Sequence, residues 1–100
     1  MHIIDTIEIG GTPALCTAIN NLGGEDHPNL ILIQCRKGYL MCGYLNMEAA
    51  ERFDDTAVLV GGADFQQVLA NPIKGMTPAA AALGIKDGMT GMEAAIILNR

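Results

Sequence analysis

The chain has 100 residues, of which 50% are apolar and 17% charged, and its formal net charge is −5. This length and composition predict one globular domain over residues 1–100. The acidic charge and the six scattered Lys and Arg residues argue against nucleic acid and anionic membranes as partners, because phosphate neutralisation needs clustered basic side chains. So few charges on a small domain also predict exposed apolar surface, which a homo-oligomer would bury.

Three cysteines, Cys16, Cys35 and Cys42, lie among apolar residues. Their number is odd and they form no Cys-x-x-Cys motif, which favours free thiols in a reducing compartment. No apolar run is long enough to cross a bilayer, and the first residues lack the basic and apolar regions of a signal peptide. We therefore expect a cytoplasmic protein.

Four strands are predicted in the first half of the chain. Branched apolar residues over 2–9 and 13–19 are typical of a hairpin. The run over 30–35 is apolar apart from one glutamine, and residues 39–45 are predicted to return antiparallel to it as a central strand with two apolar faces. Gly43, inside this return strand, suggests a bulge or the close approach of another backbone or a ligand.

The polar loop over residues 20–29 contains Glu25, Asp26 and His27, all residue types that bind metals. Three consecutive loop residues rarely converge on one ion, and the sequence has no second cluster of such residues. We therefore interpret the loop as solvated and predict neither a metal nor a cofactor.

A polar residue that can cap a helix precedes each of four predicted helices. Two strands, over 56–60 and 73–76, lie between them. This order predicts an α+β fold, a two-layer sandwich in which three to four short helices pack on a mainly antiparallel sheet. The predicted helices and their caps are 47–53 with Asn46, 65–70 with Asp64, 79–83 with Thr77, and the last ten residues with Thr90.

Two motifs carry a family resemblance. The stretch Lys37-Gly-Tyr-Leu-Met-Cys-Gly-Tyr-Leu-Asn46, with Glu48-Ala-Ala-Glu51 after it, resembles the YunC-like family of small bacterial and archaeal proteins. The stretch Leu83-Gly-Ile-Lys-Asp-Gly-Met-Thr-Gly-Met-Glu-Ala94 is similar to the ending of that family. The resemblance covers nearly the whole chain and implies a compact α+β domain. It implies no reaction, since the family is a domain of unknown function.

The chain departs from the family pattern at two positions. Family members commonly carry arginine where this chain has Met92, and also just after the strand that ends near Gly61. An anion-binding role of those arginines would therefore not carry over to this chain. The residues around Cys42 match the family pattern.

Cys42 is the candidate catalytic residue. A thiolate nucleophile needs a pKa lowered by a basic group or a helix N-terminus. The only histidines are His2 and His27, near the terminus and in the polar loop, so a Cys–His pair cannot be assumed. The alternative is a small buried thiol that only packs.

The candidate ligand-binding residues lie in two short stretches. Tyr39, Cys42 and Gly43 belong to the predicted return strand, where Tyr39 is either a ligand platform or a core aromatic. Gly61 and Gly62 follow a predicted strand and resemble a phosphate-binding turn, although Asp64 puts a carboxylate where a phosphate would sit.

Three functions compete at this point. An oligomeric module that binds a small-molecule ligand or another protein fits the apolar composition and the lack of a catalytic constellation in the sequence. The first alternative is an enzyme with Cys42 as a reactive thiol and an acid or base from Tyr39, Tyr44, Asp54 or Asp55. The second alternative is a purely structural subunit. We favour the binding module, and whether the protein is an enzyme stays open.

Overall fold

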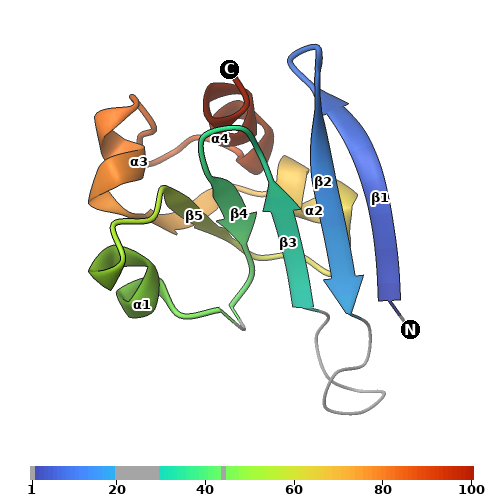
Figure 1. Ribbon diagram of the computed structural model, residues 1–100, viewed down its shortest axis with the longest axis horizontal. Helices are drawn as coiled ribbons and strands as arrows, with labels where there is room; N and C mark the ends of the chain where they lie inside the picture. The colour runs from blue at the N-terminus through green and yellow to red at the C-terminus, as the bar shows by residue number, and fades with distance from the viewer. Residues whose placement is uncertain (1, 20–29, 44) are drawn as a thin grey trace.

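One sheet forms the centre of the molecule (Figure 1). The computed structural model describes residues 2–19, 30–43 and 45–100, so the predicted loop with Glu25, Asp26 and His27, and also Tyr44, lie outside the described residues. Within the described residues six strands follow the chain in spatial order, and all neighbours are antiparallel except β4 and β5. The strands are β1 (His2–Ile9), β2 (Thr12–Ile19), β3 (Leu30–Gln34), β4 (Tyr39–Met41), β5 (Ala57–Val60) and β6 (Ile73–Met76).

The helices lie on both faces of this sheet. Alternate residues of a strand point to opposite faces, so the two clusters that meet at β5 identify which helix covers which face. Val58 and Val60 pack with α2 (Phe65–Ala70), α3 (Pro78–Ala82) and α4 (Gly91–Leu98) in the main core. On the other face, Ala57 packs with α1 (Met47–Arg52) in a smaller cluster. The predicted α+β class with a mainly antiparallel sheet is confirmed, and α1 adds a partial layer on the second face.

The helix caps predicted from the sequence are confirmed. Asn46 Oδ1 accepts hydrogen bonds from the N–H groups of Glu48 and Ala49, and the Thr90 and Glu93 side chains form a complete capping box at α4. Such caps satisfy backbone donors that a helix start leaves without partners. They fix where short helices begin, although these helices are too short to be stable alone.

The return strand is shorter than predicted. β4 ends at Met41, and the prediction of a strand over 39–45 is wrong beyond that residue. The Leu45 N–H donates to the Cys42 carbonyl at 3.1 Å, so the chain reverses there and Gly43 is an exposed turn residue. A Cβ on Gly43 would meet no atom within 4 Å. The prediction failed because the turn is as apolar as the strand that it follows.

The buried side chain of Asn99 links the C-terminal helix to the sheet by hydrogen bonds. Asn99 is 2% exposed, and its Nδ2 donates to the carbonyls of Ile9 and Thr12 at 2.9 and 2.7 Å. Its Oδ1 accepts a hydrogen bond from the Arg36 N–H at 3.0 Å. One side chain thus joins α4 to the β1–β2 and β3–β4 turns, and it satisfies backbone groups that strand pairing leaves free.

The helices leave much of the second sheet face uncovered. α1 has only six residues and packs over the part of this face formed by β4 and β5. On β1 and β2 the same face carries Ile4, which is 71% exposed, and Leu15, which is 43% exposed. A cavity lies between this face and α1.

Candidate ligand-binding pocket

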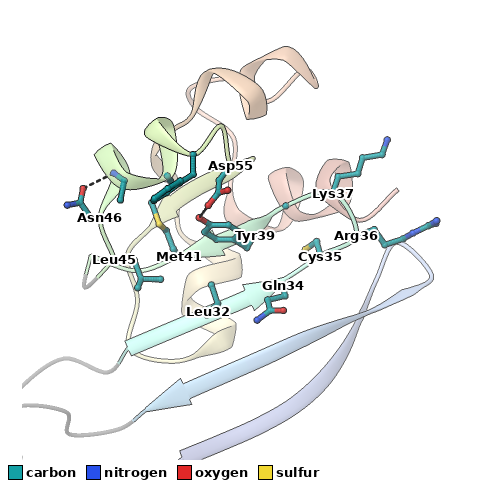
Figure 2. Close-up of a pocket in the computed structure, with 14 residues that line it drawn as sticks. Leu32, Gln34, Cys35, Arg36, Lys37, Tyr39, Met41, Leu45, Asn46 and Asp55 are labelled. Atoms are coloured by element: carbon teal, nitrogen blue, oxygen red, sulfur yellow. Dashed lines mark hydrogen bonds between the residues drawn. The ribbon is translucent and has the colours of Figure 1, made fainter.

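A cavity of about 640 Å³ lies between α1 and the strands β3 and β4 (Figure 2). Leu32 and Met41 are register partners on these strands, and their side chains point to the α1 face. Ala49 and Ala50 of α1 line the cavity beside them. The cavity is open on one side because α1, with six residues, covers only part of the apolar residues on this face of the sheet.

One hydrogen bond between side chains lies inside this pocket. The Tyr39 hydroxyl donates to Asp55 Oδ2 at 2.7 Å, and both residues are half-buried (Figure 2). Tyr39 begins β4, and its register partner on the parallel strand β5 is Ala57, two residues after Asp55. The parallel pairing therefore brings the two polar groups together across the α1 crossover.

The backbone at the end of α1 positions the Asp55 side chain in the lining of the pocket. Asp54 adopts a left-handed φ of 58°, which ends the helix, and aspartate tolerates this conformation better than most residues. The Asp55 N–H then donates to the Ala50 carbonyl at 2.9 Å. Together these features hold Asp55 above the start of β4.

The electrostatics of the pair keep the tyrosine protonated. Burial, then the hydrogen bond to Asp55 and its negative charge, raise the pKa of Tyr39 to about 12. At neutral pH Tyr39 is a neutral donor, and Asp55 is the acceptor. Burial also raises the pKa of Cys35, a pocket-lining residue whose side chain packs against the main core, to about 11, with a further contribution from Cys16. Neither Tyr39 nor Cys35 is set up as an acid–base or nucleophilic group at neutral pH.

Two basic residues lie at one end of the pocket. Arg36 and Lys37 form the β3–β4 turn, and their backbone N–H groups donate to Asn99 Oδ1 and to the Leu98 carbonyl. Figure 2 shows both charged side chains extending away from the Tyr39–Asp55 pair. Within the described part of the chain, no cation forms an ion pair with Asp55.

The predicted site residues do not gather in one place. Tyr39 lines the pocket, whereas Cys42 is 4% exposed in the main core on the opposite face of the sheet. The Cys42 Sγ accepts a hydrogen bond from the Ile31 N–H at 3.3 Å. Gly43 lies in the exposed turn that follows. A catalytic role for Cys42 and a ligand contact at Gly43 stay predictions.

Gly61 and Gly62 line a second cavity, of about 330 Å³, with Lys74. The Gly61 carbonyl accepts a hydrogen bond from Asn71 Nδ2 at 2.8 Å, and a Cβ on Gly61 would lie 2.9 Å from Lys74 Nζ. Asp64 Oδ1 caps α2 by accepting from the Gln67 N–H at 2.8 Å. That carboxylate occupies the place a phosphate would need, and ligand binding by the two glycines stays a prediction.

Several pocket residues carried no signal in the sequence. Ala49 and Phe53 fit the predicted helix as ordinary apolar residues, and Gln34 was an interruption in a strand. Asp55 entered only as one of four acid or base candidates. Recognising its pairing with Tyr39 required the parallel register of β4 and β5, which strand patterns do not reveal.

The described residues contain neither a metal-binding cluster nor a membrane-spanning helix. No three His, Cys, Asp or Glu side chains among them gather closely enough to hold a metal ion. Among the same residues, no helix has the length and apolar character needed to span a membrane.

The fold and the pocket define a small α+β protein whose sheet is covered on one face and partly open on the other. The sequence model of the family described as "Domain of unknown function (DUF1805)" matches residues 41–98, and the chain belongs to this family. It is 35% identical over 71 residues to "Uncharacterized protein YunC" of Bacillus subtilis, a match that covers 66% of this chain and 70% of YunC. The YunC-like resemblance of the sequence is thus confirmed.

A solved structure has the same fold. The protein of unknown function TA1206 from Thermoplasma acidophilum superposes with a TM-score of 0.89 at 34% identity, over 99% of this chain and 94% of that one. Both relatives are described only as uncharacterised or of unknown function.

Proposed function

We propose that this protein is a small-ligand-binding module that works as a homo-oligomer, with its ligand in the pocket between α1 and β3–β4. The observation that carries the proposal is the Tyr39–Asp55 hydrogen bond inside a cavity of about 640 Å³. Small-molecule sites typically combine apolar walls with a few fixed polar groups that orient the ligand. This pocket has that composition.

The pocket residues divide into two roles. Leu32 on β3, Leu45 just before α1 and Ala49 on α1 are partly exposed and offer an apolar surface for the body of a ligand. Asp55 offers a carboxylate that Tyr39 holds in place, so little freedom would be lost when a ligand binds. A tyrosine whose pKa is about 12 is a poor proton donor at neutral pH, which favours binding over acid–base catalysis.

The enzyme alternative has less support. Cys42 is buried on the sheet face opposite the pocket, so a ligand in the pocket and the Cys42 thiol are separated by the sheet. All three thiols are free, which supports the expectation of a reducing, cytoplasmic setting.

The homo-oligomer part of the proposal rests on the open sheet face. Ile4 and Leu15 are exposed there, and Phe53, at the end of α1, is 73% exposed at the pocket. Only 17% of the chain is charged, so few charges are available to solvate such a face. A second copy set against this face would cover these residues and close the open side of the pocket.

The ligand site is tested by filling the cavity. Ala49→Leu adds bulk inside the pocket while keeping a good helix former. Ala82→Leu makes the same change at an exposed position of α3 and is the matched control. In amide-shift NMR titrations with small apolar compounds, we expect wild type and Ala82→Leu to bind and Ala49→Leu to lose binding. Equal binding by all three proteins would contradict a site in this pocket.

The oligomer is tested separately by light scattering. We expect wild type to exceed the mass of one chain, and Ile4→Lys to reduce the protein to a monomer, because it buries a charge in the interface. Leu83→Lys, at an exposed position beside α3, should leave the mass unchanged. A monomeric wild-type protein at every concentration would show that the homo-oligomer is wrong, whatever the pocket binds.

A further inference from the structure

The chemistry of the pocket narrows the class of its ligand. This inference rests on the proposed function and goes one step beyond it, from the presence of a ligand to its charge. Three features of the pocket determine that charge: the hydrogen bonding of the Asp55 carboxylate, the aromatic side chains that line the pocket with it, and the direction of the basic side chains.

The Asp55 carboxylate has unused acceptor capacity. Its Oδ2 accepts the Tyr39 hydroxyl at 2.7 Å, yet two carboxylate oxygens can accept about four hydrogen bonds. It is half-buried, and no described cation pairs with it. A charge withdrawn from water is stabilised most by an opposite charge that also donates hydrogen bonds.

The residues that line the pocket with Asp55 favour a ligand that carries a positive charge on an apolar body. Tyr39 and Phe53 both line the cavity, and an ammonium group binds favourably to the face of an aromatic ring. Phe53 is 73% exposed, so its ring is open to a ligand in the pocket. Leu32 and Leu45, both partly exposed, supply the apolar floor.

The two basic side chains at the pocket do not pair with Asp55, so they do not compete with a ligand for its carboxylate. Arg36 and Lys37 extend away from Asp55 into solvent, where their interactions with distant charges are screened (Figure 2). An anionic ligand could reach them only by leaving the apolar floor, and inside the cavity it would meet the Asp55 carboxylate.

We propose that the pocket binds organic ammonium ions, with the N⁺–H groups donating to Asp55 and the apolar body lying on Leu32 and Leu45. A bound ammonium would replace the water that otherwise hydrates the carboxylate. Tyr39 acts as a positioning residue, because its hydroxyl fixes the orientation of Asp55 and leaves the other carboxylate oxygen to the ligand.

The test compares three probes that share one apolar body and differ in charge: 3-phenylpropylammonium, 3-phenylpropan-1-ol and 3-phenylpropanoate. Binding to the full chain is followed by the amide shifts of Gly38, Ala49 and Ala50, which line the pocket. We expect the ammonium to bind about tenfold or more tightly than the alcohol, the effect of one charge-assisted hydrogen bond. The carboxylate should bind most weakly.

Two variants then assign the preference to one carboxylate. Asp55→Asn keeps the shape and can still accept from the Tyr39 hydroxyl, so the tenfold preference for the ammonium should vanish. Asp54→Asn removes the same charge one residue away, outside the pocket, and asparagine tolerates the left-handed φ of that position. It should keep the preference.

Separate results overturn the inference and the proposed function. If the three probes bind equally well, if the carboxylate binds most tightly, or if Asp55→Asn retains the preference, the ammonium class is wrong while a ligand site in the pocket stands. If none of the three probes shifts the pocket amides, both fail. The comparison of probes on wild type decides the question even if Asp55→Asn does not fold.

Discussion

The Tyr39 hydroxyl donates a 2.7 Å hydrogen bond to Oδ2 of Asp55, which lies 16 residues further along the chain. The bond connects the first residue of β4 to the turn between α1 and β5. It therefore contributes to the packing of the crossover and also forms the polar centre of the pocket. Its loss should be visible in stability as well as in binding.

Replacing Tyr39 by phenylalanine should lower the free energy of unfolding by about 1 kcal/mol at neutral pH, the net contribution of one hydrogen bond. The pKa of Tyr39 is raised from 10.0 to about 12 in the folded state. Between these values the folded protein holds a proton that the unfolded chain releases, so the Tyr39 contribution is lost as the pH rises. Urea unfolding of both proteins at neutral pH and at about pH 11 measures this effect.

The stability gap between wild type and Tyr39→Phe should be full below pH 10 and should narrow toward pH 12. Cys35, whose pKa is also raised, to about 11, is present in both proteins and cancels in the comparison. A gap that stays constant from neutral pH to about pH 11 would contradict the raised pKa of Tyr39 and its hydrogen bond to Asp55.

Asn99→Ala should be among the most damaging single substitutions. It removes three hydrogen bonds and leaves the Ile9 and Thr12 carbonyls and the Arg36 N–H without this partner. We expect a loss of about 3 kcal/mol or more.

The matched control for Asn99 is Asn46→Ala, because it removes an exposed helix cap and should cost about 1 kcal/mol. Chemical denaturation of both variants gives the comparison. If the two substitutions cost the same, Asn99 does not fasten the C-terminus as described.

Gly91→Ala should destabilise the protein by about 1–3 kcal/mol through overpacking. α4 starts so close to α2 that a Cβ on Gly91 would overlap the Val68 carbonyl. Gly43→Ala is the control, since a Cβ there meets no atom within 4 Å and the change should stay within about 0.5 kcal/mol. Thermal unfolding of the two variants separates them, and a tolerated Gly91→Ala would mean that the helices can move apart at little cost.

Cys42 should react with thiol reagents more slowly in the native protein than in urea. Its side chain is buried, and its sulfur accepts the Ile31 N–H. Mass spectrometry of labelled peptides, with Cys42→Ala to assign the signal, measures the rate. Native labelling that is faster than labelling in urea would instead favour the reactive-thiol enzyme.

The sequence patterns that predicted the fold correctly are local ones. Asn46 and Thr90 cap helices through residues two or three positions away, so the sequence alone contains the interaction. Runs of branched apolar residues bounded by turns likewise predicted the strands of the sheet. The end of β4 was missed because an apolar turn cannot be told from an apolar strand by composition.

The site was harder to predict because it depends on contacts between distant segments. Tyr39 and Asp55 meet only through the parallel pairing of β4 and β5. Asn99 forms a hydrogen bond with the carbonyl of Ile9, which lies 90 residues earlier in the chain. Cys42 attracted attention through its motif, yet the alternation of β4 turns its side chain away from the pocket.

The central claim, that this pocket binds a small ligand, is tested most directly by NMR of methionine methyl groups. Met41 lines the pocket, whereas Met76, Met89 and Met92 pack on the opposite face of the sheet. On addition of 3-phenylpropylammonium to methyl-labelled protein, the Met41 signal should shift and saturate while the other three stay in place. An unchanged Met41 signal, or equal shifts on the opposite face, would contradict the account.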